Sequence, residues 1–83
     1  MDKDTIWEKI CQHAGETFYT KTGLPLIYEI RGETLYHNRT ATGIPRSQFE
    51  TAAAINPKPV SDLHSAVKGP AYVFAIITDE KMQ

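Results

Sequence analysis

Two segments of alternating polar and apolar residues flank a glycine-containing pair, and they restrict the fold more than any other part of the chain. The segments are Pro25 to Arg31 and Thr34 to Arg39, and Gly32-Glu33 lies between them. This pattern predicts an antiparallel hairpin with a two-residue loop, because glycine readily adopts the positive φ that such a loop requires. The loop length also sets the register, which places Arg31 opposite Thr34.

The predicted register gives the hairpin an apolar face and a polar face. The apolar face is expected to meet the core, and its pairs are Ile30 with Leu35, Tyr28 with His37, and Leu26 with Arg39. On the other face, the pairs are Glu29 with Tyr36 and Ile27 with Asn38. A short strand at Thr17 to Thr20 precedes the hairpin, with a turn around Gly23. If this strand keeps the alternation, the outer face carries Tyr19, Lys21, Glu29, Arg31, Tyr36 and Asn38.

The N-terminal segment has the period of an amphipathic helix. Its apolar stripe consists of Ile6, Trp7, Ile10, Cys11 and Ala14. Thr5 and Glu8 match a capping box, and Gly15 stands where a helix is expected to stop. We therefore predict a helix between Thr5 and Gly15, with Cys11 as a small buried side chain.

The middle of the chain predicts a second helix that ends at prolines. After a loop at Thr40 to Ile44, Ser47 and Glu50 match another capping box. The helix that starts there is expected to run to about Ile55, because the two prolines within Asn56 to Pro59 favour extended backbone.

The C-terminal segment is ambiguous between strand and helix. Ser61 is expected to cap one short turn. Residues 70–78 have the β-branched and aromatic content of a strand, but Pro70 suits a first helical position and favours a short buried helix. The order α-β-β-β-α, followed by a helical or strand tail, predicts an α+β fold. In this fold a three-stranded antiparallel meander packs against the N-terminal helix and one or more C-terminal helices.

Length and composition exclude several classes of protein. The chain has 83 residues, so we expect one domain spanning 1–83. A single cysteine cannot form an internal disulfide. The longest apolar run, residues 71–77, is too short to cross a bilayer, and the first residues lack a secretory signal. These features predict a cytoplasmic protein without a membrane partner.

Two resemblances accompany this interpretation. The pattern Gly15-x-x-Phe18-x-Thr20-x-x-Gly23-x-Pro25-x-x-Tyr28, followed by Gly69-Pro70-Ala71-Tyr72, resembles a small group of uncharacterised bacterial domains. That group has no known activity, so the resemblance implies no site residues; Pro45 departs from the capping serine expected there. The order α-β-β-β-α also resembles the double-stranded-RNA-binding fold, but the basic cluster of its second helix is absent here.

No constellation of residues predicts catalysis. Cys11 and His13 are potential metal ligands, but positions i and i+2 of a helix point in different directions. Ser47, Asp62 and His64 are the residue types of a hydrolytic triad, without the nucleophile elbow or oxyanion-hole glycines that accompany one. We therefore expect no enzyme activity, no metal or other cofactor and no small-molecule substrate.

Charge is distributed unevenly, although the formal net charge is only −1. Residues 18–60 carry five basic and three acidic side chains, whereas residues 1–17 carry two basic and four acidic ones. Cations, aromatic rings and an amide on one sheet face are suited to contact phosphates, stack on bases and read base edges. The predicted nucleic-acid-binding residues are Tyr19, Lys21, Arg31, Tyr36, Asn38, Arg39 and Arg46.

A protein partner is the alternative interpretation. Tyrosine and arginine are also enriched at protein interfaces, and Ile27 would be an exposed apolar centre on the same face. A short edge strand offers a place for a partner strand. The sequence therefore predicts a non-catalytic binding or accessory domain. The predicted partner is nucleic acid, in particular DNA. The alternatives are a protein partner, self-association or an architectural role.

Overall fold

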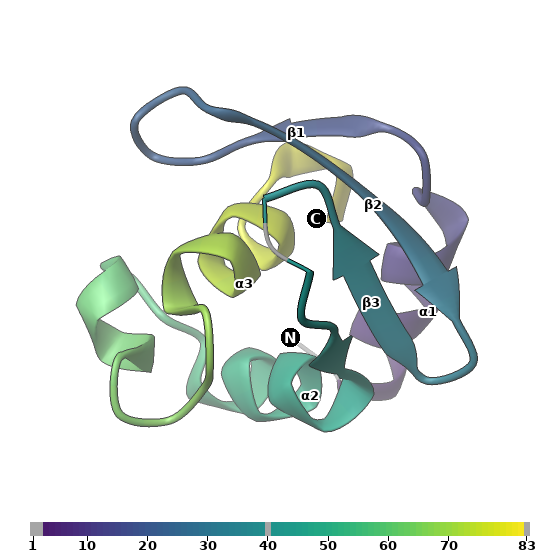
Figure 1. Cartoon of the computed structure of the whole chain (residues 1–83). Coiled ribbons are helices and arrows are strands. Elements are labelled where there is room, and N and C mark those ends of the chain that lie inside the picture. Colours follow the sequence, from purple (N-terminus) through teal and green to yellow (C-terminus); the bar gives the residue numbers. More distant parts are fainter. Residues whose placement is uncertain (1–2, 40, 83) are drawn as a thin grey trace.

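The predicted hairpin lies at the centre of a four-stranded antiparallel sheet in the order β1-β2-β3-β4 (Figure 1). The computed structural model describes residues 3–39 and 41–82, so Thr40 of the predicted loop lies outside the described residues. The elements are α1 (Lys3–Gln12), β1 (Thr17–Tyr19), β2 (Pro25–Arg31), β3 (Thr34–His37), β4 (Ile44–Pro45), α2 (Arg46–Ile55), η1 (Val60–Leu63), α3 (Pro70–Ile77) and η2 (Glu80–Met82). The α+β class is confirmed, with the two-residue β4 as an additional strand.

The hairpin has the predicted register. Its pairs are Tyr28 with His37, Glu29 with Tyr36, Ile30 with Leu35, and Arg31 with Thr34. Gly32 supplies the positive φ, at 63°, that the two-residue loop requires. β3 ends at His37 instead of Arg39, and β1 ends at Tyr19 instead of Thr20. The loop therefore determined the pairing as expected, while both strands are shorter than predicted.

The two neighbours of β2 pair with different halves of it. β1 pairs with residues 25–27 of β2, and β3 pairs with residues 28–31. β4 then pairs with the first two residues of β3, opposite the end of β2. The sheet curls from β1 to β4, which lies beside α2 (Figure 1). This stagger matters for function, because residues on the outer face of β1 and of β3 lie at opposite ends of β2.

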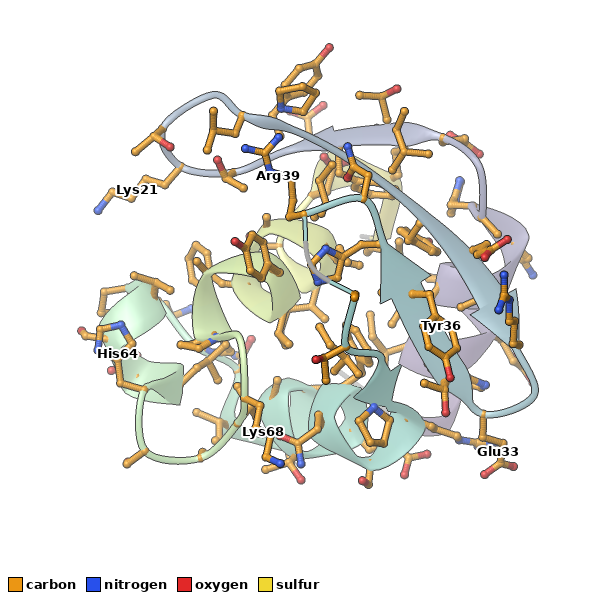
Figure 2. All side chains as sticks on the ribbon, viewed as in Figure 1. Lys21, Glu33, Tyr36, Arg39, His64 and Lys68 are labelled. Atoms are coloured by element: carbon orange, nitrogen blue, oxygen red, sulfur yellow. The ribbon has the colours of Figure 1, made fainter. Side chains whose placement is uncertain are left out.

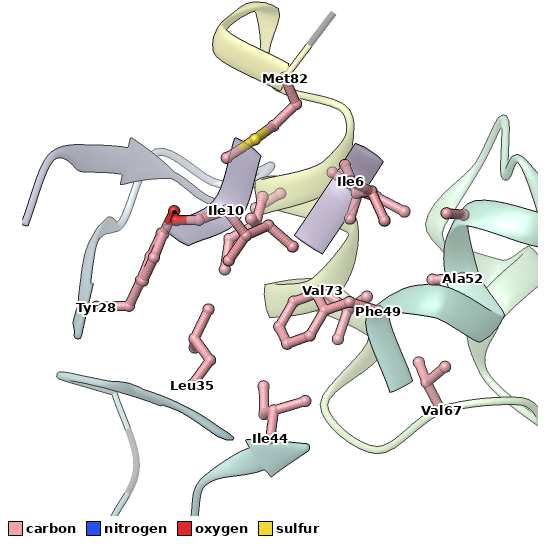
Figure 3. Close-up of a cluster of buried hydrophobic side chains, with 14 of the residues drawn as sticks. Ile6, Ile10, Tyr28, Leu35, Ile44, Phe49, Ala52, Val67, Val73 and Met82 are labelled. Carbon is pink, nitrogen blue, oxygen red and sulfur yellow. Dashed lines mark hydrogen bonds between the residues drawn. The ribbon is translucent and has the colours of Figure 1, made fainter. Parts of the chain in front are cut away.

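Alternation along the strands separates a buried face from an exposed face. Leu26, Tyr28 and Leu35 point into the core, where apolar side chains of α1, α2 and α3 cover them. Figure 3 shows Ile6, Phe49 and other members of this cluster packed between the sheet and the helices. The predicted apolar face of the hairpin is therefore the core face.

α1 begins earlier than the sequence predicted. The helix includes Lys3, so Thr5 lies inside its first turn and the predicted capping box is wrong. Cys11, predicted to be buried, is exposed. α2 covers Trp7, whose ring centroid is 5.9 Å from that of Phe49, but Cys11 lies one helical turn beyond this contact.

α2 begins at Arg46, so the prediction of Ser47 as its cap is wrong. Pro45 is the N-cap residue; its backbone is extended, and its side chain makes no capping hydrogen bond. The N–H of Arg46 donates instead to the carbonyl of Glu33 in the β2–β3 loop, at 2.8 Å. A carbonyl distant in sequence thus does what a capping side chain would do. The helix ends at Ile55, as predicted.

α3 confirms that residues 70–77 favour a helix over a strand. Pro70 occupies the start of the helix and Gly69 precedes it with a φ of 60°. Four of its eight residues are buried, including Val73 and Ile76. Ser61 lies inside η1, whose N-cap is Pro59, so Ser61 is not the predicted cap. Among residues 3–39 and 41–82, no helix is long and apolar enough to cross a membrane.

Candidate functional site

The outer face of the sheet is open to solvent over much of its length, and the predicted site residues lie on it or beside it. Tyr19, Lys21, Glu29, Arg31 and Asn38 are exposed, and Tyr36 is half-buried. Because β1 and β3 flank different halves of β2, these residues divide into two groups. Figure 2 shows Lys21 and Tyr36 at opposite ends of the sheet.

The group on β2 and β3 is largely occupied by contacts within the protein. The guanidinium of Arg31 pairs with Glu29, with 2.6 Å between Nη2 and Oε1. The same guanidinium lies over the ring of Tyr36, 5.2 Å from its centroid. Residues i and i+2 of a strand share a face, so this ion pair follows from the alternation itself. The positive charge of Arg31 is therefore balanced locally.

Tyr36 packs against the backbone that connects β3 to β4. A Cβ atom added at Gly43 would lie 2.7 Å from Cε1 of Tyr36 and 2.5 Å from Cγ2 of Thr34. Only a glycine leaves room for the ring at this position. Gly43 and Arg31 cover the ring of Tyr36. The ring therefore contributes to packing within the protein and has little free surface on which a base could stack.

The side chain of Asn38 extends the hairpin beyond the end of β3. Its Oδ1 accepts a hydrogen bond from the N–H of Ile27 at 3.0 Å, and its own N–H donates to the carbonyl of Ile27 at 3.0 Å. The predicted pairing of Ile27 with Asn38 is therefore present. One side of the amide is used in this contact, so the carbonyl oxygen that would read a base edge is already engaged.

The group on β1 and the first half of β2 is apolar and exposed. Tyr19 is 61% exposed, Leu24 44% and Ile27 43%. Tyr19 lies opposite Pro25, which is also exposed. We call Tyr19, Pro25 and Ile27 the outer apolar patch. Leu24 lies opposite Thr20, whose N–H donates to its carbonyl, so alternation places its side chain on the other side of the hairpin. In the part of the chain that the structure describes, the neighbouring Lys21 makes no ion pair.

A depression lies directly beside the outer apolar patch. It is an open hollow of about 500 Å³ between β2 and β3, and its lining includes Gly15, Ile27, Glu29, Tyr36 and Asn38. Tyr19 is more exposed than any other large apolar or aromatic side chain among the described residues. Tyr19 does not line this depression, and Ile27 lies between the protruding ring and the hollow. Tyr19 and Lys21 line another hollow, of about 330 Å³, together with residues 74, 75 and 78–80.

The side chain of Lys81 covers the edge of the sheet at β1. The ammonium of Lys81 donates to the carbonyl of Thr17 at 3.1 Å and lies 4.4 Å from the centroid of the Phe18 ring. A lysine at an edge strand opposes the addition of another strand. The predicted use of this edge for a partner strand is therefore disfavoured, and the face of the sheet is the more accessible surface.

Arg46 belongs to the framework of the fold. Its Nε contacts Oε2 of Glu50 at 2.8 Å, and its Nη1 is 3.5 Å from Oε1 of Glu33. The guanidinium also lies 5.9 Å from the centroid of the Trp7 ring. Arg46 thus joins α2 to the hairpin and to α1, and two carboxylates balance its charge.

A second cavity, of about 190 Å³, lies between the C-terminal end of β3, residues 42–44 and the start of α3. Its lining includes His37, Ile44, Lys68, Gly69 and Tyr72. The ring of His37 contacts that of Tyr72 in a tilted arrangement, with 4.6 Å between centroids and 41° between the ring planes. Burial, and secondarily the charge of Arg39, lower the pKa of His37. Of the predicted site residues, Arg39 alone is close to this cavity, and the sequence analysis did not identify the other residues.

The described residues do not bring together a recognisable catalytic or metal-binding group. Among them, no three His, Cys, Asp or Glu side chains are placed to hold a metal ion. His64, the residue after η1, is exposed and lies away from α2, the helix that carries Ser47 (Figures 1 and 2). Comparisons with known proteins yield no matching family model, no matching curated protein and no matching solved structure.

Proposed function

We propose that this chain is a non-catalytic interaction domain that self-associates through the outer face of its sheet. The observation that carries the proposal is the outer apolar patch, with Tyr19 61% exposed, next to the depression lined by Ile27 and Tyr36. Monomeric proteins rarely leave large apolar side chains grouped on one face unless that face binds a partner. A second copy of the chain offers both the ring and the hollow.

A two-fold contact centred on Ile27 uses both features at once. Along β2, Ile27 lies between Pro25, opposite Tyr19, and Glu29, at the depression. A two-fold axis makes the contact self-complementary, so Tyr19 of each copy enters the depression of the other. The same axis brings Lys21 of one copy toward Glu29 of the other, which gives the contact charge complementarity.

The size of the patch sets the expected strength of this contact. A standard interface buries about 800 Å² on each partner. The surface of this domain totals 4753 Å², so such an interface would cover about a sixth of it. The outer apolar patch and the depression occupy part of one sheet face. We therefore expect reversible association with a dissociation constant of about 10 μM to 1 mM.

Sedimentation velocity over a range of concentrations tests the proposal. The wild-type protein should shift from monomer toward dimer between about 10 μM and 1 mM. Ile27→Ser should weaken association at least about tenfold, because it removes the apolar centre. Ile55→Ser is the matched control: Ile55, at the end of α2, is 40% exposed but lies outside the sheet. A wild type that stays monomeric, or equal effects of the two substitutions, would contradict the proposal.

Nucleic acid is the second candidate partner, and the unpaired cations favour it. Among residues 3–39 and 41–82, Lys21 and Arg39 make no ion pair, whereas Arg31 and Arg46 do. Cations without a carboxylate partner remain available to phosphates. The exposed ring of Tyr19, close to Lys21 along the chain, suits stacking on an unpaired base.

Fluorescence anisotropy with labelled single- and double-stranded DNA and RNA separates the two candidates. Binding to nucleic acid should weaken steeply between about 50 and 200 mM salt. Arg39→Ala and Lys21→Ala should reduce it more than Arg31→Ala, because Glu29 already balances Arg31. The absence of binding at the lower salt concentration, together with dimerisation, would leave self-association as the function.

A further inference from the structure

The cavity beside α3 combines features that a ligand site requires, and it is separate from the outer sheet face. It lies between β3, residues 42–44 and the start of α3, with a volume of about 190 Å³. A cavity of about 150 Å³ accommodates a benzene ring, so this space suits a six-membered ring with one substituent. No residue of the outer apolar patch lines this cavity.

His37 presents a hydrogen-bond donor that has no partner in the protein. The side chain is 7% exposed, and its Nδ1 accepts the N–H of Arg39 at 3.1 Å. An acceptor at Nδ1 places the proton of the neutral ring on Nε2. Within the described chain, Nε2 has no acceptor, yet no buried side-chain polar atom is unsatisfied. Nε2 therefore retains contact with solvent, and His37 lines this cavity as well as the open hollow between β2 and β3.

The surroundings of the cavity are positively charged. Lys68 contributes to the lining, and none of the lining residues is acidic. Among the residues that the structure describes, neither Lys68 nor the adjacent Arg39 makes an ion pair. Figure 2 shows Arg39 above and Lys68 below the start of α3. An anion in the cavity would meet one lining cation, Lys68, whose charge no carboxylate balances.

The remaining wall of the cavity is apolar and closely packed. Tyr72 and Ile44 contribute to it, and Gly69 lies against both: a Cβ atom there would be 3.3 Å from Cδ2 of Tyr72 and 3.8 Å from Cδ1 of Ile44. Gly69 also has a φ of 60°, which favours glycine. An aromatic surface on one side and a cation on the other is a common design for small-molecule sites.

We propose that this cavity binds a small aromatic carboxylate. The carboxylate accepts hydrogen bonds from Nζ of Lys68 and from Nε2 of His37, and the ring of the ligand packs against Tyr72 and Ile44. One cation and one neutral donor match a singly charged carboxylate. The sequence alone led us to expect no small-molecule substrate. It did not reveal this cavity, because His37 and Tyr72 are distant in sequence and carry no motif.

A titration with benzoate at pH 7.5 in about 50 mM salt tests the proposal. Amide chemical shifts and calorimetry both measure the binding. We expect a dissociation constant of about 1 mM, with the largest shifts at Gly43 and Gly69. Benzamide has the same shape without the charge, and it should bind at least about tenfold more weakly. Lys68→Met should have an equal effect on benzoate, while Lys58→Met, a substitution of an exposed lysine outside the cavity, should have none.

Inorganic phosphate is the third probe, and it distinguishes an aromatic carboxylate site from a general anion site. Phosphate should displace benzoate only at concentrations about tenfold higher than the dissociation constant of benzoate. The proposal is overturned if benzoate does not bind by about 20 mM, if benzamide binds equally well, or if phosphate binds more tightly than benzoate. Equal loss of benzoate binding in the two lysine variants would also overturn it, with thermal unfolding showing that both are folded.

Discussion

Tyr28→Phe removes one oxygen atom, and it tests how the sheet is joined to α1. The hydroxyl of Tyr28 donates to the carbonyl of Ile10 at 2.5 Å (Figure 3). The ring of Tyr28 packs against that of Phe18, with 5.4 Å between centroids. Ile10 lies in the last turn of α1, where carbonyls have no partner within the helix. Burial, followed by nearby Cys11 and carboxylates, raises the pKa of Tyr28, so the phenol remains a donor.

The expected cost follows from what the substitution leaves behind. Phenylalanine keeps the contact with Phe18 but leaves the buried carbonyl of Ile10 without a donor. A lost hydrogen bond costs about 1 kcal/mol, and an unsatisfied buried acceptor raises this to about 2 kcal/mol. For a domain of this size, 2 kcal/mol lowers the melting temperature by roughly 8–16 °C.

Urea unfolding of Tyr28→Phe and of Tyr19→Phe measures this cost against a matched control. Tyr19 is 61% exposed, and among the described residues its hydroxyl makes no hydrogen bond, so its substitution should change stability by less than about 0.5 kcal/mol. Equal stabilities of the two variants would refute the reasoning. Such a result would mean that another donor reaches the carbonyl of Ile10 once the hydroxyl is gone.

Three further predictions concern His37, Gly43 and Arg46. The pKa of His37 is lowered in the folded state, so stability should fall as pH drops below about 6.5, where only the unfolded chain takes up the proton. Urea unfolding between pH 7.5 and 5 should show a smaller loss in His37→Gln than in wild type, whereas His64→Gln, at an exposed histidine, should behave as wild type. Gly43→Ala should cost about 1–2 kcal/mol in chemical unfolding, because the new methyl group displaces the ring of Tyr36. Arg46→Ala should cost about 1 kcal/mol by the same assay, through its lost contacts with Glu50 and Trp7, whereas Arg31→Ala, which breaks an exposed pair, should cost less than about 0.5 kcal/mol.

The hairpin was predictable because its information is local. The two-residue loop at Gly32-Glu33 and the alternation on either side set the register, and the structure has the predicted pairs from Arg31 with Thr34 to Tyr28 with His37. The predicted pair of Leu26 with Arg39 is absent, because β3 ends at His37. The ion pair between Glu29 and Arg31 could also be predicted from the sequence, because alternate residues of a strand share a face. Arg46 and Glu50 likewise have the i, i+4 spacing of a helical ion pair. Both spacings indicate that carboxylates within the chain balance the charges of Arg31 and Arg46. These two arginines are therefore less available to a ligand than the net positive charge of residues 18–60 alone would predict.

The start of α2 and the cavity beside α3 depend on contacts between distant parts of the chain. The carbonyl of Glu33 satisfies the N–H of Arg46, so the helix needs no capping serine at its first turn. His37 meets Tyr72 only because β3 packs beside α3, and neither residue belongs to a local motif. Sequence periodicity assigns residues to faces, but it does not say which faces of distant elements meet.

A dilution series followed by amide chemical shifts tests most directly the claim that the outer face of the sheet is the functional surface. Between about 1 mM and 20 μM, the resonances of Tyr19, Ile27 and Glu29 should move together along one dimerisation curve. Those at the end of α2, around Ile55, should stay fixed. Shifts that do not depend on concentration, or that are largest on α2, would contradict the account.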